Sequence, residues 1–441
     1  MSDSLSRRSF VIGSGAALAA TANSAALASA AAKELGVLGP LVGHVGAQTA
    51  ILWARIPIAG RYALELATTE PDSVPLEEIG DFFAKTDFTG RWRFEELRPS
   101  TTYRYRLVPS AKLGGLEIEG TFRTAPHQDL KTKVSLAFGS CATEDEGSRS
   151  VWRRIRAEKV DGLILCGDTP YIDSTDLTKQ RQRYREFSAV EEFQDIARTI
   201  PVWGTWDDHD FGKNDADGRL RGKENARQAF TEYRALSNFG DGKTGIYTCF
   251  RYGPVEVFVI DARWFANTEP SPVEPNKSTL LGAAQWEWLK AGLKSSTAPW
   301  KVLATGMIWD AKLNGEKDHW EFYAHERRAI FDFIRAERIG GVVLLGGDIH
   351  VSRALRYAAE NTVGYPLYQF ITSPIHHRVI PALNNEHPDL LFSAVKPHTF
   401  LKLTCDATGP DPQLTARFLN RDGELLFDEI TLSLKDISHP A

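Results

Sequence analysis

The stretch Val342–His350, VVLLGGDIH, joins an apolar run to two glycines and then to an aspartate and a histidine two positions apart. An apolar run this short, ended by glycine, is typical of a strand buried on both faces of a parallel sheet. In an extended segment alternate side chains point the same way, so Asp348 and His350 are expected to face one ligand. The stretch therefore predicts an α/β fold with polar side chains where a strand ends.

Three further apolar runs end in a glycine or a turn and then in polar side chains. They are Val134–Gly139 before Ser140-Cys141, Gly162–Cys166 before Gly167-Asp168-Thr169-Pro170-Tyr171, and Pro201–Thr205 before Trp206-Asp207-Asp208-His209. Sites in open α/β sheets form beyond the carboxyl ends of strands, so we expect the four tips to meet. A lone cysteine is usually a small buried hydrophobe, and a lone Gly-Asp is usually a turn. Four such ends together favour a shared metal site, because charge gathered there is costly without a cation.

The donor types in these tips divide into a softer and a harder set. The softer set, which suits trivalent iron or another transition ion, contains Cys141, Asp168, Tyr171 and His350. The harder set, which suits calcium, magnesium or manganese, contains Asp168, Asp208, Asn214 and Asp348. Asp168 stands in both sets because a carboxylate can offer one oxygen to each ion. Two metals about 4 Å apart fit in-line phosphoryl transfer, since they stabilise both the attacking and the leaving oxygen.

The segment Leu35–Pro126 has an all-β pattern of short alternating runs separated by turn residues. Its run Leu97–Tyr105, LRPSTTYRY, resembles the corner of fibronectin type III domains, in which a tyrosine ties the sandwich to nearby backbone. We therefore predict a fibronectin type III-like β-sandwich over residues 33–126, with a scaffolding role.

Strands and helices alternate after residue 126, which predicts an α/β domain over residues 127–441. Further strands are expected at Val255–Ile260 and Val302–Met307. Helices with amphipathic spacing are expected at Arg149–Lys159, Thr178–Thr199, Glu224–Leu236, Ala283–Leu293 and His325–Glu337. A closing hairpin is expected to join Leu414–Leu419 to Glu424–Phe427.

Residues 1–32 have the features of a twin-arginine signal peptide. The segment Ser6–Ile12, SRRSFVI, precedes a weakly apolar run and small-x-small cleavage sites. The run is too short, and too rich in Ala, Gly and Ser, for a stable membrane anchor. We expect a periplasmic or secreted protein that the twin-arginine export machinery carries in its folded, metal-loaded form.

Composition excludes some classes of protein. The net charge of the 441 residues is -5, which gives no electrostatic case for binding nucleic acid or anionic membranes. The four cysteines are widely spaced and include no C-x-x-C pair, so neither a zinc ribbon nor a disulfide scaffold is indicated.

The ordered set of tips resembles the alkaline phosphatase D (PhoD-like) branch of the metallophosphoesterases. The matching motifs are Ser140-Cys141, Gly167-Asp168-x-x-Tyr171, Trp206-Asp207-Asp208-His209-Asp210 and Gly347-Asp348-Ile349-His350. The export signal and the β-sandwich also fit, so the resemblance covers nearly the whole chain. It implies a metallophosphoesterase-type αββα sandwich, a mixed centre of Fe3+ with one or two Ca2+ ions, and hydrolysis of phosphate esters.

Two features separate this branch from metallophosphatases at large. Ser140-Cys141 stands where others carry D-x-H, and the segment Gly306–Asp310 offers no histidine. Both count against a generic zinc or dimanganese centre, while another divalent metal stays open. The resemblance does not decide between Asp208 and Asn214 as the ligand from the third tip, so both are retained.

Catalytic roles are expected for two residues. His209 is placed to protonate the leaving oxygen. Arg263 follows another strand and either contacts phosphate or forms a structural salt bridge with Asp261 or a neighbour. His376 and His377 follow a further apolar run and are open candidates for the rim of the site. Loop support by hydrogen bonding is the expected role of Asp207, Asp210 and Asp215.

The leading hypothesis is an exported metal-dependent hydrolase of phosphate monoesters, diesters or both. A phospholipase D-like phosphodiesterase is an alternative that the sequence does not separate from it. An iron-dependent oxidoreductase is a less favoured class, because no two-His-one-carboxylate signature is present and the harder set would have no purpose. A noncatalytic surface-binding protein would leave the whole ligand set unexplained.

Overall fold

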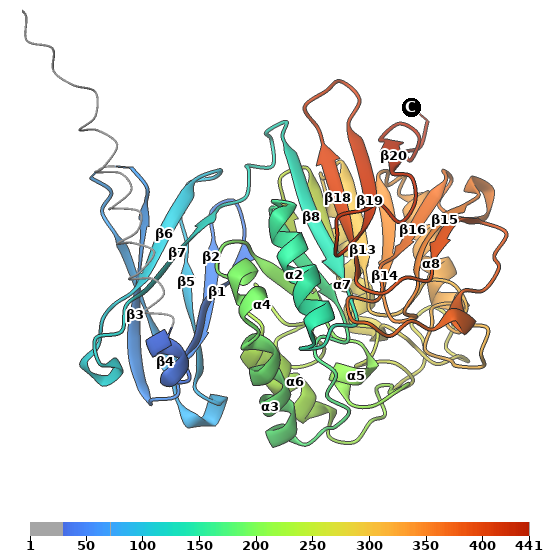
Figure 1. Ribbon diagram of the computed structural model, residues 1–441. Helices are drawn as coiled ribbons and strands as arrows, with labels where there is room; N and C mark the ends of the chain where they lie inside the picture. The colour runs from blue at the N-terminus through green and yellow to red at the C-terminus, as the bar shows by residue number, and fades with distance from the viewer. Residues whose placement is uncertain (1–29, 71, 441) are drawn as a thin grey trace, which may run out of the picture.

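The computed structural model describes residues 30–70 and 72–440 (Figure 1). The twin-arginine motif and the apolar run after it lie outside the described residues. Within the described part of the chain, no helix is both long and apolar enough to cross a membrane.

The N-terminal part forms a β-sandwich of two antiparallel sheets, as the alternating pattern predicts. One sheet has the order β1 (Leu38–Val45), β2 (Ala50–Arg55), β5 (Thr89–Phe94). The other has the order β4 (Leu76–Phe82), β3 (Gly60–Thr68), β6 (Thr102–Leu107), β7 (Ile118–Arg123). The Tyr103 hydroxyl lies 2.9 Å from the backbone nitrogen of Arg98 and accepts its hydrogen bond. This contact has the form of a tyrosine corner, and the closer likeness to fibronectin type III domains stays a prediction.

Two larger sheets form the α/β part. The six-stranded sheet has the order β10 (Val202–Thr205), β9 (Gly162–Cys166), β8 (Lys133–Gly139), β18 (Thr399–Asp406), β19 (Gln413–Asn420), β20 (Ile430–Ser433). The seven-stranded sheet has the order β11 (Thr248–Tyr252), β12 (Val255–Val259), β13 (Trp300–Ala304), β14 (Val342–Gly346), β16 (Leu367–Ile371), β15 (Ser352–Tyr357), β17 (Leu390–Ala394). Strands β8, β9 and β10 run parallel, and so do β12, β13, β14 and β16.

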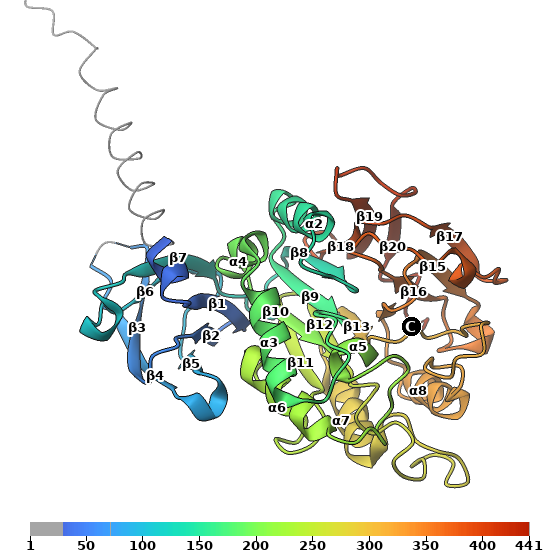
Figure 2. The same ribbon diagram turned by 60° about the horizontal axis from the view of Figure 1, so that its bottom comes forward.

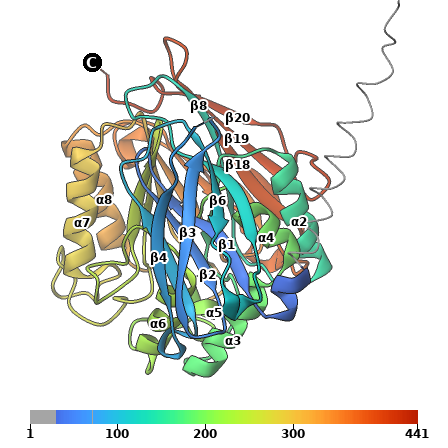
Figure 3. The same cartoon turned by 90° about the vertical axis from the view of Figure 1, so that its left-hand side faces the viewer.

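The two sheets face each other between two layers of helices (Figures 1 and 3). Helices α2 (Glu146–Ala157) and α4 (Glu191–Ala197) cover one side, and α7 (Gly282–Ser295) and α8 (Ala324–Ala336) cover the other. Rings from opposite sheets touch: Trp203 stacks on Phe250 with 3.8 Å between centroids. All five residues of β9, β13 and β14 are buried, and β9 and β14 have no charged or polar side chain, as expected of strands covered on both faces.

Two expectations about elements are wrong. The helix expected over Thr178–Thr199 is split into α3 (Leu177–Ser188) and α4, because buried Val190 is extended and Glu191 and Glu192 begin a new first turn. The expected hairpin is found only as a short turn: Glu424–Phe427 forms the bridge Leu419–Leu425 and two backbone hydrogen bonds but no strand, and the strand that pairs with β19 is β20.

The β-sandwich packs on α6 (Lys223–Tyr233) and the ends of α3 and α4 (Figure 2). The Trp53 indole N–H donates to the Glu232 carbonyl at 2.7 Å, and the Tyr105 hydroxyl donates to the Arg198 carbonyl at 3.0 Å. Asp87 pairs with Arg185 at 2.7 Å. Hydrogen bonds and an ion pair therefore join the two parts.

Candidate metal centre

The four strand tips expected to meet do lie together. Three overlapping groups of side chains bring their ligand atoms within 4.8 Å of one another and are able to hold an ion: Cys141, Asp168 and His350; Asp168, Asp208 and His209; Asp208, Asp215 and Asp318. Asp168 belongs to two of these groups, which is the arrangement expected of a bridging carboxylate. The one-turn helix α5 (Asp208–Phe211) supplies Asp208 and His209 of the middle group.

The tips share an unusual backbone conformation. Cys141, Asp168, Asp348 and His350 all have positive φ, between 53° and 67°. The argument that Asp348 and His350 face one ligand from an extended segment is therefore wrong, since each lies in the left-handed region. Each non-glycine residue in this conformation lowers the stability of the fold by roughly 1–3 kcal/mol, and such residues are frequent at functional sites.

Glycine lets two of the tips pack against each other. Gly167 has a φ of +83°, and a Cβ there would lie 2.4 Å from the Cβ of Asp207. The second tip thus needs both the conformational freedom and the missing side chain of glycine.

The group of Cys141, Asp168 and His350, called the softer group below, is buried and is held by hydrogen bonds. The Cys141 sulfur lies 3.6 Å from Oδ2 of Asp168 and accepts a hydrogen bond from the Ser373 hydroxyl at 3.2 Å. The Tyr171 hydroxyl lies 2.9 Å from Nε2 of His350 and 3.0 Å from Nε2 of His376. Tyr171 therefore contacts the group through His350, and His376 is a buried neighbour of the site.

The Asp207–Asp210 segment separates into two roles. Asp207 and Asp210 form the capping box of α5, and the Asp207 backbone nitrogen donates to Oδ1 of Asp210 at 2.5 Å. Asp208 turns toward the ligand groups and accepts hydrogen bonds from the backbone nitrogens of His209 and Asp215 at 3.0 and 2.7 Å.

His209 lies at the mouth of the site. Its side chain is 22% exposed, and its Nδ1 lies 2.6 Å from Oδ1 of Asp173. Its ring packs on Tyr171 with 4.6 Å between centroids. The carboxylate at Nδ1 leaves Nε2 as the nitrogen that can serve a reacting group.

Arg263 is fully buried and forms ion pairs at 2.5 Å with Asp207 and 3.1 Å with Asp318. Of the two roles expected for Arg263, this geometry fits the structural salt bridge, and the partners are Asp207 and Asp318 rather than Asp261. Asp261 instead accepts a hydrogen bond from the Arg263 backbone nitrogen at 3.0 Å.

Two candidates lie on the surface. Asn214 is exposed in the turn that follows α5, and its neighbour Asp215 joins a ligand group. His377 is exposed and its Nδ1 lies 2.9 Å from Oδ2 of Asp145.

Sequence reasoning missed Lys312 and Asp318. The Lys312 side chain is 2% exposed, and its ammonium lies 2.5 Å from Oδ2 of Asp348, 2.9 Å from Oδ1 of Asp318 and 3.1 Å from Oε2 of Glu316. The sequence feature that could have indicated them is the cluster of charged residues between Trp309 and Trp320. The rings of these two tryptophans stack with 4.0 Å between centroids, and both are buried, so both ends of the segment lie in the core.

The buried carboxylates of the cluster repel one another, so a bound cation would stabilise their charged forms. Burial, followed by the charges of Asp208 and Asp207, raises the pKa of Asp168 well above its ordinary value. Burial also raises the pKa of Asp348 to about 7, against the opposing charge of Lys312. Burial alone would raise the pKa of Asp208, but the charges of Arg263 and Lys312 and the hydrogen bond from the Asp215 backbone nitrogen act together with smaller effects to lower it.

The donor set therefore fits metal ions. Like charges this close cannot all ionise without a cation between them. In addition, Oδ2 of Asp207 and Nδ1 of His350 are buried without a hydrogen-bond partner among the described residues. Carboxylate, imidazole and thiolate side chains together offer both hard and soft donors.

The sequence model of the PhoD-like phosphatases matches residues 136–409, which includes all four tips. The chain belongs to this family. It is 27% identical over 310 residues to alkaline phosphatase D of Bacillus subtilis (strain 168), covering 58% of this chain and 52% of that relative. The chain thus spans about half the length of the curated relative that it matches.

Solved structures support the fold of this PhoD-like chain. A structure of PhoD matches with a TM-score of 0.71 and 20% identity, over 90% of this chain and 88% of the other. Purple acid phosphatase PPD1 from yellow lupin (Lupinus luteus) seeds matches with a TM-score of 0.69 and 15% identity, over 92% and 77%. The expected metallophosphoesterase-like α/β fold is thereby confirmed.

Proposed function

We propose that this protein is a metal-dependent phosphoesterase that hydrolyses phosphate monoesters, diesters or both. The observation that carries the proposal is the overlap of three potential ligand groups through Asp168 and Asp208. A PhoD-like family membership supports the same reaction class.

Metals held by these groups would supply Lewis-acid stabilisation of the phosphoryl oxygens. The softer group, Cys141, Asp168 and His350 with Tyr171 beside it, suits Fe3+. The carboxylates of Asp208, Asp215 and Asp318 suit one or two Ca2+ ions, or another divalent metal. Asp348 and Asn214 remain proposed ligands of the harder ion.

The chain's own residues complete the site. His209, held through Nδ1 by Asp173, presents Nε2 to donate a proton to the leaving oxygen. Arg263 holds Asp207 and stands 3.8 Å from Asp208, so it orients the third tip.

The proposal includes export by the twin-arginine machinery and a periplasmic or secreted location. The motif that supports it is Ser6–Ile12. A fusion of residues 1–32 to a reporter should reach the periplasm, and replacement of Arg7 and Arg8 by lysine should retain the reporter inside the cell.

One panel tests the reaction class. Metal-loaded protein is assayed with 4-nitrophenyl phosphate and bis(4-nitrophenyl) phosphate, with and without added calcium, and its metals are counted. Hydrolysis of at least one ester is expected. No turnover of either by protein holding its full metal complement would refute the hydrolase, and the ratio of the two rates separates monoesterase from diesterase.

Cys141→Ala tests the softer group. We expect iron and activity to be lost together, because the thiolate is removed from the group. Cys405→Ala is the matched control, since Cys405 is also a buried free cysteine but lies on β18 outside all three groups. Iron retained at full occupancy with unchanged turnover would remove Cys141 from the site. A visible absorption band that disappears in Tyr171→Phe would support phenolate ligation of iron.

A further inference from the structure

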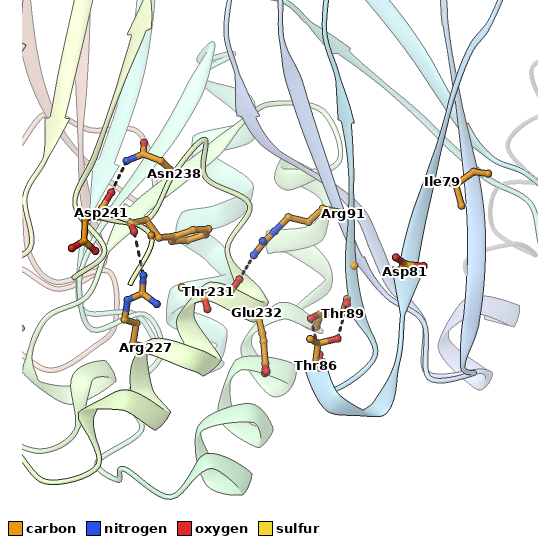
Figure 4. A pocket seen from close by; sticks show the side chains of 14 residues that line it. Ile79, Asp81, Thr86, Thr89, Arg91, Arg227, Thr231, Glu232, Asn238 and Asp241 are labelled. Carbon is orange, nitrogen blue, oxygen red and sulfur yellow. Dashed lines mark hydrogen bonds between the residues drawn. The ribbon is translucent and has the colours of Figure 1, made fainter. Parts of the chain in front are cut away.

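A pocket of about 950 Å³ opens between the β-sandwich and α6 (Figure 4). Its walls are formed by β4, β5, α6 and the loop that contains Asn238–Gly242. This volume lies within the range of small-molecule sites. None of the candidate metal ligands lines it, so it is distinct from the site described above.

Arg91 reaches into this pocket from the sandwich wall. Its Nη2 donates to the Thr231 carbonyl and, at 2.6 Å, to the Arg234 carbonyl. Its guanidinium carbon lies 5.2 Å from the centre of the Phe239 ring. Its Nε is buried without a hydrogen-bond partner in the described chain.

Arg227 rises from α6 on the opposite wall. Its Nε donates to the Gly245 carbonyl at 2.8 Å and its Nη2 to the Phe239 carbonyl at 3.2 Å. Within residues 30–70 and 72–440, neither guanidinium forms an ion pair, and neither Nη1 makes a hydrogen bond. Each arginine therefore has donor capacity left over.

The acidic residues that line the pocket are engaged elsewhere. Glu232 accepts two hydrogen bonds from Arg181, at 2.8 and 2.6 Å. Asp241 accepts from two backbone nitrogens of its own loop, at 2.8 and 2.6 Å. Asp81 is exposed and pairs with Arg61 at 3.3 Å.

The two arginines are half-buried, and neither pairs directly with a carboxylate among the described residues; the charge of Asp241 acts on Arg227 only at longer range. Burial lowers the pKa of Arg91 to about 10, which the charge of Glu232 only partly offsets. Burial also lowers the pKa of Arg227. An anion placed between them would reverse this cost, because each guanidinium still has N–H groups to donate.

We propose that the pocket binds a phosphate-type oxyanion between Arg91 and Arg227. Guanidinium groups hold phosphate oxygens in pairs of parallel hydrogen bonds, which an ammonium cannot do. The anion would contact both the β-sandwich and α6, so its binding stabilises the packing of the two parts.

Equilibrium dialysis of labelled inorganic phosphate against the metal-loaded protein tests the site. Two phosphates per chain are expected, one at the metal centre and one in the pocket. Arg227→Met and Arg91→Lys should each weaken the second binding event at least tenfold and leave inhibition of ester hydrolysis by phosphate unchanged. Arg98→Met, at an exposed arginine paired with Glu70, is the matched control and should bind like the parent.

The outcomes are separable from the proposed activity, because dialysis counts bound phosphate even if no ester is hydrolysed. A single phosphate that a substrate analogue displaces, or two phosphates in every variant, would overturn the pocket. Thermal unfolding checks that Arg91→Lys and Arg227→Met are folded. Phenylphosphonate, which is not hydrolysed, identifies the source: tighter binding than phosphate indicates an oxyanion carried on a larger molecule, and weaker binding indicates the free ion.

Discussion

At the scale of single residues, the candidate metal centre combines side chains that lie far apart in the sequence. Asp318 and Lys312 come from a segment with no strand or helix period, and nothing in the sequence points them at Asp348. The Arg263–Asp207 pair joins positions 56 apart, so its geometry could not be inferred from spacing. The tip residues were predictable because each follows an apolar run and a turn.

His209 makes a prediction that depends on the leaving group. His209→Ala should slow hydrolysis of an alkyl phosphate about 100-fold or more, as expected for loss of a general acid. The loss should be much smaller for 4-nitrophenyl phosphate, whose leaving oxygen needs no proton. Steady-state kinetics on both esters and metal counting measure this. Equal losses on both esters, or loss of metal, would show that His209 is a ligand or holds one in place.

Lys312 makes a prediction about stability. Lys312→Met removes the cation that faces Asp348, Asp318 and Glu316, so the metal-free protein should lose about 3 kcal/mol of unfolding free energy. Loaded with metal, the variant should recover part of that loss, because a bound ion supplies positive charge. Urea unfolding with and without metal measures both values.

Lys294→Met is the matched control for Lys312. Lys294 pairs with Glu337 at 3.0 Å but is largely exposed, so its removal should cost less than about 1 kcal/mol. Equal costs for the two variants would mean that Lys312 is not an essential charge of the site.

At the scale of elements, the strand ends are held together by tight backbone packing. Gly167→Ala forces a side chain into the left-handed region and against Asp207, and should cost more than about 2 kcal/mol. Gly115→Ala is the control: Gly115 has a φ of +78° but open space around its Cβ position, so only the backbone cost remains. Unfolding free energies and metal content compare the two. Equal destabilisation and full metal retention in both would show that the close approach is unimportant.

The elements also show where sequence reasoning reaches its limit. The buried parallel strands were predictable because a five-residue apolar run that ends at a glycine or a turn is too short for a helix. The break between α3 and α4 was not, because it depends on Val190 finding a buried place in the core. The left-handed conformations of Asp348 and His350 were not predictable either, since neither residue type requires them.

At the scale of the whole molecule, a histidine lies in the contact between the β-sandwich and the α/β part. His44 on β1 accepts a hydrogen bond from the Trp203 indole at 3.2 Å through Nδ1, and its backbone nitrogen donates to the Ala235 carbonyl at 2.7 Å. Burial, with a smaller effect of the Arg93 charge, lowers the pKa of His44 to about 4. The neutral ring is therefore the form that fits the interface.

This lowered pKa predicts acid sensitivity with a defined sign. The ordinary pKa of histidine is 6.5, so between pH 6.5 and about pH 4 the unfolded chain binds a proton at His44 and the folded protein does not. The contribution of His44 should lower the unfolding free energy by about 3 kcal/mol as the pH falls from 6.5 to 4, and this contribution should not change above pH 6.5. His44→Asn keeps an acceptor for Trp203 but cannot titrate, so its unfolding free energy should depend on pH by that much less between pH 7 and pH 4. Urea unfolding at several pH values measures the difference; identical pH profiles for the variant and the parent would refute a role for His44 ionisation in holding the two parts together.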